Sequence, residues 1–301
     1  MTKRVAIAGA SGLIGGALRR HLVERGDDVV VLVRRPSGAS DEVAWDPQSG
    51  TLDPNLLAGV DAIVNLAGAG IGDKRWNDEH KRLVLTSRLD ATRTIVGSIA
   101  TERQRSGRIV RLVNASAVGY YGDRGDEVLA ESSPPGTDFL ASVVVAWEQA
   151  ALAAEPDASV AVIRTGLVMS PDGGAFKPLL LLSRLGLGGP LGSGRQWWPW
   201  ITLTDEVRAI AHLVDDPDLT GAFNLAAPDE ARQADIARAL ARALHRPAVL
   251  PVPQFALRAV IGEFADGIVA SQRVHPERLA AAGFVFEQPD LASAVRWTVQ
   301  R

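Results

Sequence analysis

Short apolar segments alternate with longer segments of mixed polarity along most of the chain. The apolar runs lie at residues 5–8, 29–33, 43–45, 62–66, 110–114, 160–164 and 222–225. Continuous apolar runs of this length are typical of strands that are buried on both faces of a parallel sheet. Helical patterns occupy residues 17–25, 77–100 and 139–154. This alternation predicts an α/β fold with a doubly wound parallel sheet and right-handed crossovers.

The alternation is interrupted in the second half of the chain. Residues 170–199 are rich in glycine and proline, and we interpret them as an insertion over the active site. From residue 228 onward the pattern is mostly helical. Helices are expected at residues 235–244, 255–264 and 276–282, with a proline-containing stretch at 247–253. The predicted organisation is a Rossmann-like core of residues 1–165, completed by 201–226, and a smaller, mostly helical substrate lobe of residues 166–200 and 227–301.

A glycine-rich turn follows the first apolar run and leads into a helix. Gly9 permits a tight turn, Gly12 lets a pyrophosphate approach the backbone, and Gly15 lets the helix lie close to the strand. A purely structural turn is the alternative, but the order strand, turn, helix and strand favours a bound dinucleotide. The residues expected to line the dinucleotide are Gly9, Ser11, Gly12, Leu13, Ile14 and Gly15.

The end of the second apolar run indicates which dinucleotide binds. An NAD site usually offers an acidic residue there to the ribose 2′-hydroxyl, whereas this chain offers Arg34 and Arg35. Two guanidinium groups match a 2′-phosphate in charge and in geometry. The alternative is a solvated basic turn before Pro36. We therefore expect NADP(H) as the cofactor and this part of the chain as an NADP-binding core.

Composition and charge limit the classes of protein to which the chain could belong. A chain of 301 residues with 47% hydrophobic residues can bury a large core, and its net charge of −3 gives no general attraction for nucleic acid or acidic membranes. No apolar run reaches the length of a membrane span, and no signal peptide is recognised. The chain has no cysteine, and its five histidines have no ligand spacing, so no metal site is expected. A cytoplasmic protein with a small-molecule substrate is predicted, either a monomer or a dimer.

Ligands of doubly wound sheets bind beyond the carboxyl ends of the strands, so residues at these ends are candidates for the site. The small residues after the fourth apolar run would let a nicotinamide ribose approach. Ser116 and Arg164 follow at the ends of two later runs. The cofactor-binding residues expected beyond the glycine turn are Leu66, Ala67, Gly68, Arg88, Ser116 and Arg164, together with Arg34 and Arg35.

The spacing of the three glycines resembles that of the extended and atypical short-chain dehydrogenases/reductases. In that family a serine at a strand end, followed by Tyr-Gly, is catalytic, and Ser116 before Tyr121 resembles this element. The resemblance implies a hydroxyl that donates to a developing alkoxide. A downstream Tyr-x-x-x-Lys pair is missing, because the expected positions, counted back from Glu148, hold Leu140 and Val144.

A second set of motifs covers essentially the whole chain. They are residues 68–72, Arg75-Trp76, Ser87-Arg88, residues 116–122, Gly173-Gly174, Gly188-Gly189, Gly192, Gly194, Gln196-Trp197, Trp200-Ile201, Asp205, Asn224, residues 272–276 and Gly283-Phe284. Together they resemble the epimerase family within these proteins, described as nucleoside-diphosphate-sugar epimerases with a short C-terminal domain of unknown function. That family usually lacks the Tyr-Lys pair as well.

Without that pair, three other groups are candidates for proton transfer or anion binding. Tyr120 or Tyr121 could act with Ser116, or pack at a strand end. Lys81 could face the site, or lie on the surface. Arg88 could anchor an anion, or support its helix. The tryptophans at residues 197, 198 and 200 are either core residues or a stacking platform for a flat ligand.

We expect an NADP(H)-binding oxidoreductase of the atypical extended short-chain type that acts on a small or nucleotide-linked carbonyl or alcohol. In such an enzyme the cofactor transfers a hydride while the protein orients and polarises the substrate. Two other functions fit the same residues. One is a non-catalytic NADPH-binding sensor or scaffold, and the other is a nucleotide-sugar epimerase.

Overall fold

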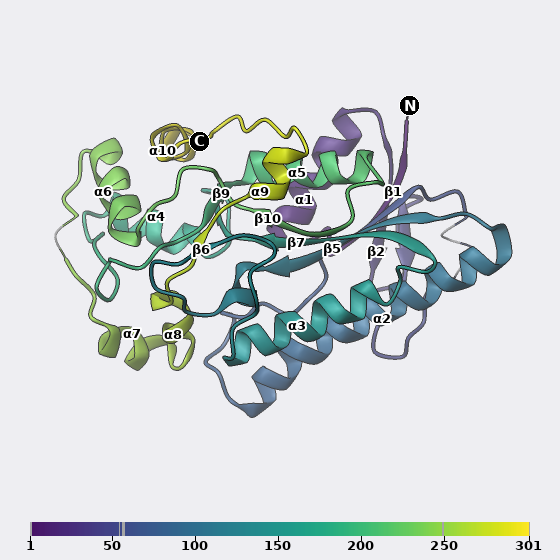
Figure 1. The fold of residues 1–301 in the computed structure, drawn as a ribbon, viewed down its shortest axis with the longest axis horizontal. Coiled ribbons are helices and arrows are strands. Elements are labelled where there is room, and N and C mark those ends of the chain that lie inside the picture. Colours follow the sequence, from purple (N-terminus) through teal and green to yellow (C-terminus); the bar gives the residue numbers. More distant parts are fainter. Residues whose placement is uncertain (1, 54, 56–57, 249, 301) are drawn as a thin grey trace.

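A seven-stranded parallel sheet forms the centre of the molecule (Figure 1). The computed structural model describes residues 2–53, 55, 58–248 and 250–300. The strand order is β10-β7-β5-β4-β1-β2-β3. The strands are β1 (Arg4–Ala8), β2 (Asp28–Val33), β3 (Glu42–Ala44), β4 (Ala62–Asn65), β5 (Val110–Ala117), β7 (Ala158–Thr165) and β10 (Gly221–Leu225). The order reverses between β1 and β4, which confirms the doubly wound fold and places the ligand crevice at their carboxyl ends.

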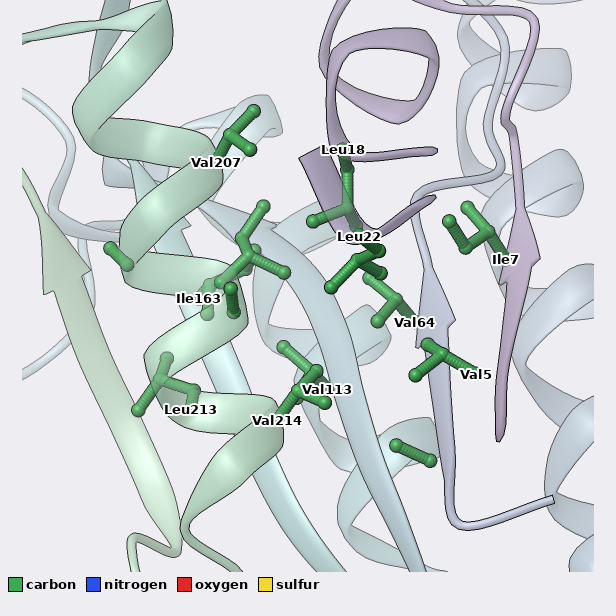
Figure 2. Packing of buried hydrophobic residues seen from close by; sticks show 14 of the residues in the cluster. Val5, Ile7, Leu18, Leu22, Val64, Val113, Ile163, Val207, Leu213 and Val214 are labelled. Carbon is green, nitrogen blue, oxygen red and sulfur yellow. The ribbon is translucent and has the colours of Figure 1, made fainter. Parts of the chain in front are cut away.

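Two helical layers enclose the sheet. Helices α1 (Leu13–Glu24) and α5 (Leu203–Asp215) cover one face, and α2 (Asp78–Ser106) and α3 (Phe139–Leu152) cover the other (Figure 1). Figure 2 shows Leu18 and Leu22 of α1, and Val207 and Leu213 of α5, in one apolar cluster with strand residues such as Val113 and Ile163. Strands that are apolar on both faces need such a cover.

Most of the further helices and two small sheets lie at one end of the molecule, beyond the carboxyl ends of the strands, whereas α9 (Glu277–Ala281) lies beside α5 and the start of β10 (Figure 1). The two-stranded sheets pair β6 (Val128–Leu129) with β11 (Arg273–Val274), and β8 (Leu167–Met169) with β9 (Trp200–Thr202). The helices are α4 (Phe176–Arg184), α6 (Gln233–Leu244), α7 (Gln254–Ile261), α8 (Phe264–Val269), α9 (Glu277–Ala281) and α10 (Leu291–Gln300). Among the described residues, no helix combines the length and the apolar character that crossing a bilayer requires.

Several boundaries differ from the sequence predictions. Helix α1 begins at Leu13 rather than residue 17, because Gly12 ends the turn in extended backbone and serves as the N-cap. Strand β5 continues to Ala117, so that Ser116 lies on the strand. The helix predicted at 255–264 is two helices, because Gly262 has a φ of +69° and breaks it. The insertion at 170–199 contains α4, and residue 249 of the stretch 247–253 lies outside the described residues.

Candidate dinucleotide-binding and active site

The glycine turn has no room for side chains at two of its three positions. A Cβ on Gly9, whose φ is +84°, would lie 2.7 Å from the carbonyl oxygen of Leu66. A Cβ on Gly15 would lie 2.3 Å from the carbonyl oxygen of Gly9. At Gly12 the only atom of the described residues within 4 Å of an added Cβ is the Gly9 carbonyl oxygen, at 3.3 Å. Gly12 therefore has one tight backbone contact and is otherwise open at the start of α1.

The start of α1 offers hydrogen-bond donors without acceptors. Gly12 provides no side-chain cap, and the first helical bond of α1 runs from the Gly16 amide to the Gly12 carbonyl. The amides of Leu13, Ile14 and Gly15 have no acceptor among the described residues. Free amides together with the helix dipole bind anions. A cavity of about 970 Å³ opens beside them, between α1 and the loop of residues 172–174.

The two arginines after β2 differ in their partners. Arg35 donates to both carboxylate oxygens of Glu42, at 2.6 and 2.9 Å. This bond lowers the pKa of Glu42 to about 2. Arg34 is exposed, and its side chain makes no hydrogen bond or ion pair with the residues that the structure describes. The guanidinium of Arg34 is therefore unengaged among the described residues, whereas that of Arg35 is already paired with Glu42.

The loop after β4 touches the glycine turn on one side and α2 on the other. Leu66 and Ala67 lie against Gly9, as described above, and Gly68 lies against Arg88 of α2. The Nη1 atom of Arg88 donates to the carbonyl oxygens of Ala69 at 3.0 Å and Val84 at 2.8 Å. Residues 66–68 thus lie between the glycine turn and Arg88, at the carboxyl end of β4.

A buried polar network joins β5, β7 and α3. The Ser116 hydroxyl donates to Glu148 at 2.5 Å, and Arg164 forms two bonds with the same carboxylate, at 2.8 and 2.9 Å. Burial alone would lower the pKa of Arg164, but its bonds to Glu148 and the nearby charges raise it overall. The proton of Ser116 is therefore committed to Glu148, which differs from the donor role implied by the family resemblance. The oxygen lone pairs of Ser116 remain as acceptors.

The two tyrosines occupy different environments. The Tyr121 hydroxyl is buried and donates to Asn224 at 2.6 Å, and Arg164 donates to it at 3.0 Å. Burial raises the pKa of Tyr121 to about 12. Tyr120 is half-buried, its hydroxyl has no hydrogen-bond partner among the described residues, and its ring stacks on Arg164, with 3.5 Å between Cζ and the ring centroid. Of the two phenols, that of Tyr120 is the one free to reach a ligand.

Lys81 and the tryptophans mainly contact other side chains of the protein. Lys81 forms an ion pair with Glu263 at the start of α8 and lies over the ring of Trp76. Trp197 stacks against two arginine side chains and donates to Asp126. Trp200 is fully buried. Packing, rather than a stacking platform, accounts for these contacts.

Leu140 and Val144, at the positions expected for the missing Tyr-Lys pair, lie on the side of α3 that faces the end of β5. A Cβ on Gly119 would lie 3.6 Å from Leu140 and 4.0 Å from Val144, so both side chains face η2 (Val118–Tyr121), the 3₁₀ turn after β5. Neither can exchange a proton.

Sequence reasoning missed three buried carboxyl groups near the strand ends. Glu148 holds Ser116, as described, and Glu131 accepts from the amide of Asn224. Glu206 of α5 accepts from Thr165 at 2.8 Å, and burial raises its pKa to about 8. A polar residue in an otherwise apolar helix face was the available signal for Glu148 and Glu206.

The chain is similar to proteins that share this arrangement. Residues 5–226 match the model of the NAD dependent epimerase/dehydratase family, and residues 252–298 match a domain of unknown function (DUF1731). An epimerase family protein of Mycobacterium bovis is 42% identical over 299 residues, which cover 99% of this chain and 98% of the relative.

Two solved structures are also similar. That of the human epimerase family protein SDR39U1 with NADPH has a TM-score of 0.90, 33% identity and 99% coverage of both chains. That of a nucleoside-diphosphate sugar epimerase from Corynebacterium glutamicum has a TM-score of 0.82 and 33% identity, and the match covers 99% of this chain and 58% of the other. These matches agree with the glycine turn and the sheet order. The chain therefore belongs to the NAD dependent epimerase/dehydratase family, with the C-terminal domain of unknown function.

Proposed function

We propose that this chain is an NADP(H)-binding oxidoreductase of the atypical extended short-chain type. The observation that carries the proposal is the glycine turn, where unpaired amides of α1 meet open space at Gly12. Residues 9–15 would hold the pyrophosphate, and residues 66–68 border the same crevice. Arg34, without an ion-pair partner among the described residues, would bind the 2′-phosphate. The NADPH in the human relative supports this choice. When bound, NADP(H) supplies or accepts a hydride.

The chain's own groups would orient the substrate and transfer the proton. In the direction of reduction, a hydride adds to the carbonyl carbon and a proton must reach the oxygen. We assign this proton to the hydroxyl of Tyr120, which has no described hydrogen-bond partner. The hydroxyl of Ser116 donates its proton to Glu148, so Ser116 would accept a hydrogen bond from the ligand. Tyr121 is a positioning residue, since its buried hydroxyl anchors Arg164 beneath Tyr120.

The helical end of the molecule would supply the rest of the substrate site. We propose that residues 166–200 and 227–301 form the substrate lobe and that its ligand is a small or nucleotide-linked carbonyl or alcohol. The loop of residues 172–174 borders the cavity beside the glycine turn, which supports this division.

A non-catalytic NADPH-binding sensor or scaffold is the second candidate. The apolar pair Leu140 and Val144 favours it, because the usual proton donor of the fold is missing. Sugar-nucleotide epimerisation is the third, and the similarity to the Corynebacterium glutamicum structure favours it.

One assay separates the three candidates. The absorbance of reduced nicotinamide is followed while carbonyl compounds, alcohols and nucleotide sugars are added, and products are identified by mass spectrometry. An oxidoreductase changes the absorbance with substrate, and Tyr120→Phe reduces the rate by about 10²-fold or more. Conversion of a nucleotide sugar without net absorbance change indicates an epimerase. Tight NADPH binding without any conversion indicates a sensor or scaffold.

A further inference from the structure

Arg88 of α2 is a half-buried cation with no ion-pair partner among the described residues. Its guanidinium lies over the ring of Trp147, with Cζ 5.0 Å from the ring centroid. No aspartate or glutamate of the described residues forms an ion pair with it. Burial lowers the pKa of Arg88 to about 10, so the group stays charged at neutral pH. A desolvated charge without a counter-ion is unfavourable unless another group compensates it.

Its hydrogen bonds occupy only one edge of the guanidinium. Nη1 donates to the carbonyl oxygens of Ala69 and Val84, as described above. Nε and Nη2 have no acceptor among the described residues, and neither atom is sealed from solvent. Arg88 therefore keeps two adjacent donors unused, in the geometry that binds the two oxygens of a carboxylate or phosphate.

Arg111 shows what a structural arginine looks like in the same protein. It is also buried, has no carboxylate partner, and has a pKa lowered by burial to about 10. Its Nε, Nη1 and Nη2 atoms all donate, to the carbonyl oxygens of Leu213 and Leu219 and to the hydroxyl of Ser159. A role limited to packing thus satisfies every nitrogen of Arg111 but leaves two nitrogens of Arg88 unused.

Arg88 lies beside the loop that follows the carboxyl end of β4. Gly68 at the carboxyl end of β4 is exposed, and a Cβ there would lie 3.2 Å from Cγ and 3.3 Å from Cζ of Arg88. On the other side, Trp147 belongs to α3 and follows Val144 by one turn. Val144 is the residue at the expected position of the missing lysine. The glycine turn already provides amides for the cofactor pyrophosphate, so the charge of Arg88 is available for another group.

We propose that the free edge of Arg88 binds an anionic group, a carboxylate or a phosphate, of a molecule that occupies the crevice. The proposal deepens the proposed function, on which it rests, by giving the substrate a negative charge next to its reacting carbon. The anion has two sources, the substrate or a phosphate of NADP(H) itself. They are distinguished by whether the site accepts an anion when NADPH is already bound.

The test is a calorimetric titration of inorganic phosphate and of acetate into NADPH-saturated protein. The variant is Arg88→Gln, and the matched control is Arg93→Gln, which removes an exposed charge from the same helix. If the anion belongs to the substrate, wild type and Arg93→Gln bind phosphate or acetate. Arg88→Gln then binds the same anion at least about tenfold more weakly, and its affinity for NADPH is unchanged. If it belongs to the cofactor, Arg88→Gln weakens NADPH about tenfold, and phosphate competes with NADPH.

The proposal would be overturned if Arg88→Gln bound phosphate, acetate and NADPH as tightly as the wild-type protein does. Circular dichroism establishes that the variant is folded. A crystal structure of the wild-type protein soaked in phosphate gives a second readout if the variant does not fold. It supports the proposal if an anion lies within hydrogen-bond distance of Nε and Nη2, and contradicts it if anions bind only elsewhere. Neither experiment requires turnover, so a failure to find a carbonyl substrate is distinguishable from a failure of this site.

Discussion

The sharpest prediction concerns Gly12, which should tolerate a side chain in the folded protein but not in the cofactor complex. Its φ of −80° and ψ of 173° are open to any residue. Within 4 Å of an added Cβ lies only the Gly9 carbonyl oxygen, at a distance of 3.3 Å. We therefore expect Gly12→Val to lower the free energy of unfolding by no more than about 1 kcal/mol.

The same substitution should abolish cofactor binding. Its methyl groups would extend into the open space beside the amides of Leu13, Ile14 and Gly15, where the pyrophosphate would sit. Each hydrogen bond to a charged group contributes about 1.5–3 kcal/mol, so loss of two of them weakens NADPH by roughly 10²-fold or more. Isothermal titration calorimetry measures the affinity, and thermal unfolding measures the stability.

Gly15→Ala is the matched comparison, because its Cβ would lie 2.3 Å from the Gly9 carbonyl oxygen and 2.8 Å from Cα of Ala10. Neither backbone atom can move without separating α1 from β1. We expect this variant to lose stability by at least about 1–3 kcal/mol, whether or not cofactor is present. Gly12→Val with wild-type affinity for NADPH would refute the assignment of the glycine turn as the phosphate site.

Three further predictions follow from the charges around the site. Arg34→Ala should weaken NADPH by roughly tenfold or more and leave NADH unchanged, whereas Arg35→Ala should have a smaller effect because its guanidinium is already ion-paired. Glu148→Gln should lower the free energy of unfolding by about 3–5 kcal/mol, because Arg164 would remain buried without its counter-ion. The pKa of Glu206 is about 8 in the folded state against an ordinary 4.5, so the folded state holds a proton that the unfolded state releases. Stability should therefore fall by a few kcal/mol between about pH 4.5 and 8, and Glu206→Gln should remove most of that fall.

Each of these three predictions has a control variant or a result that would contradict it. Equal losses of NADPH and NADH affinity in Arg34→Ala would exclude a 2′-phosphate contact. Glu127→Gln removes an exposed carboxylate bonded to Arg124, and urea unfolding should show almost no change for it. A Glu148→Gln midpoint equal to that of Glu127→Gln would contradict the buried network. Parallel stability profiles of wild type and Glu206→Gln across pH would exclude the titration of Glu206.

The sequence predicted the sheet, the glycine turn and the cofactor class, because these depend on residues close together in the chain. It did not predict the state of Ser116, whose partner Glu148 lies 32 residues away. That contact requires β5 to continue to Ala117 and α3 to turn Glu148 toward the sheet, and both are tertiary effects. The pairing of Arg35 with Glu42 was missed for the same reason, since β3 brings the carboxylate beside β2.

The missing Tyr-Lys pair was visible in the sequence, but its replacement was not. Only the structure separates Tyr120, with a free hydroxyl, from Tyr121, which is buried and bonded to Asn224. The two residues are adjacent and chemically identical, so no pattern of residue types distinguishes them. The turn of η2 directs one ring outward and the other into the core.

If the glycine turn and Arg34 form an NADP(H) site, the ratio of the dissociation constants for NADPH and NADH must favour NADPH. Calorimetric titration of wild-type protein with both dinucleotides, at one pH and ionic strength, gives this ratio. We expect NADPH to bind at least about tenfold more tightly, because a charge-assisted contact to the 2′-phosphate adds about 1.5–3 kcal/mol. Equal affinities, tighter binding of NADH, or no binding of either dinucleotide would contradict an NADP(H) site at this turn.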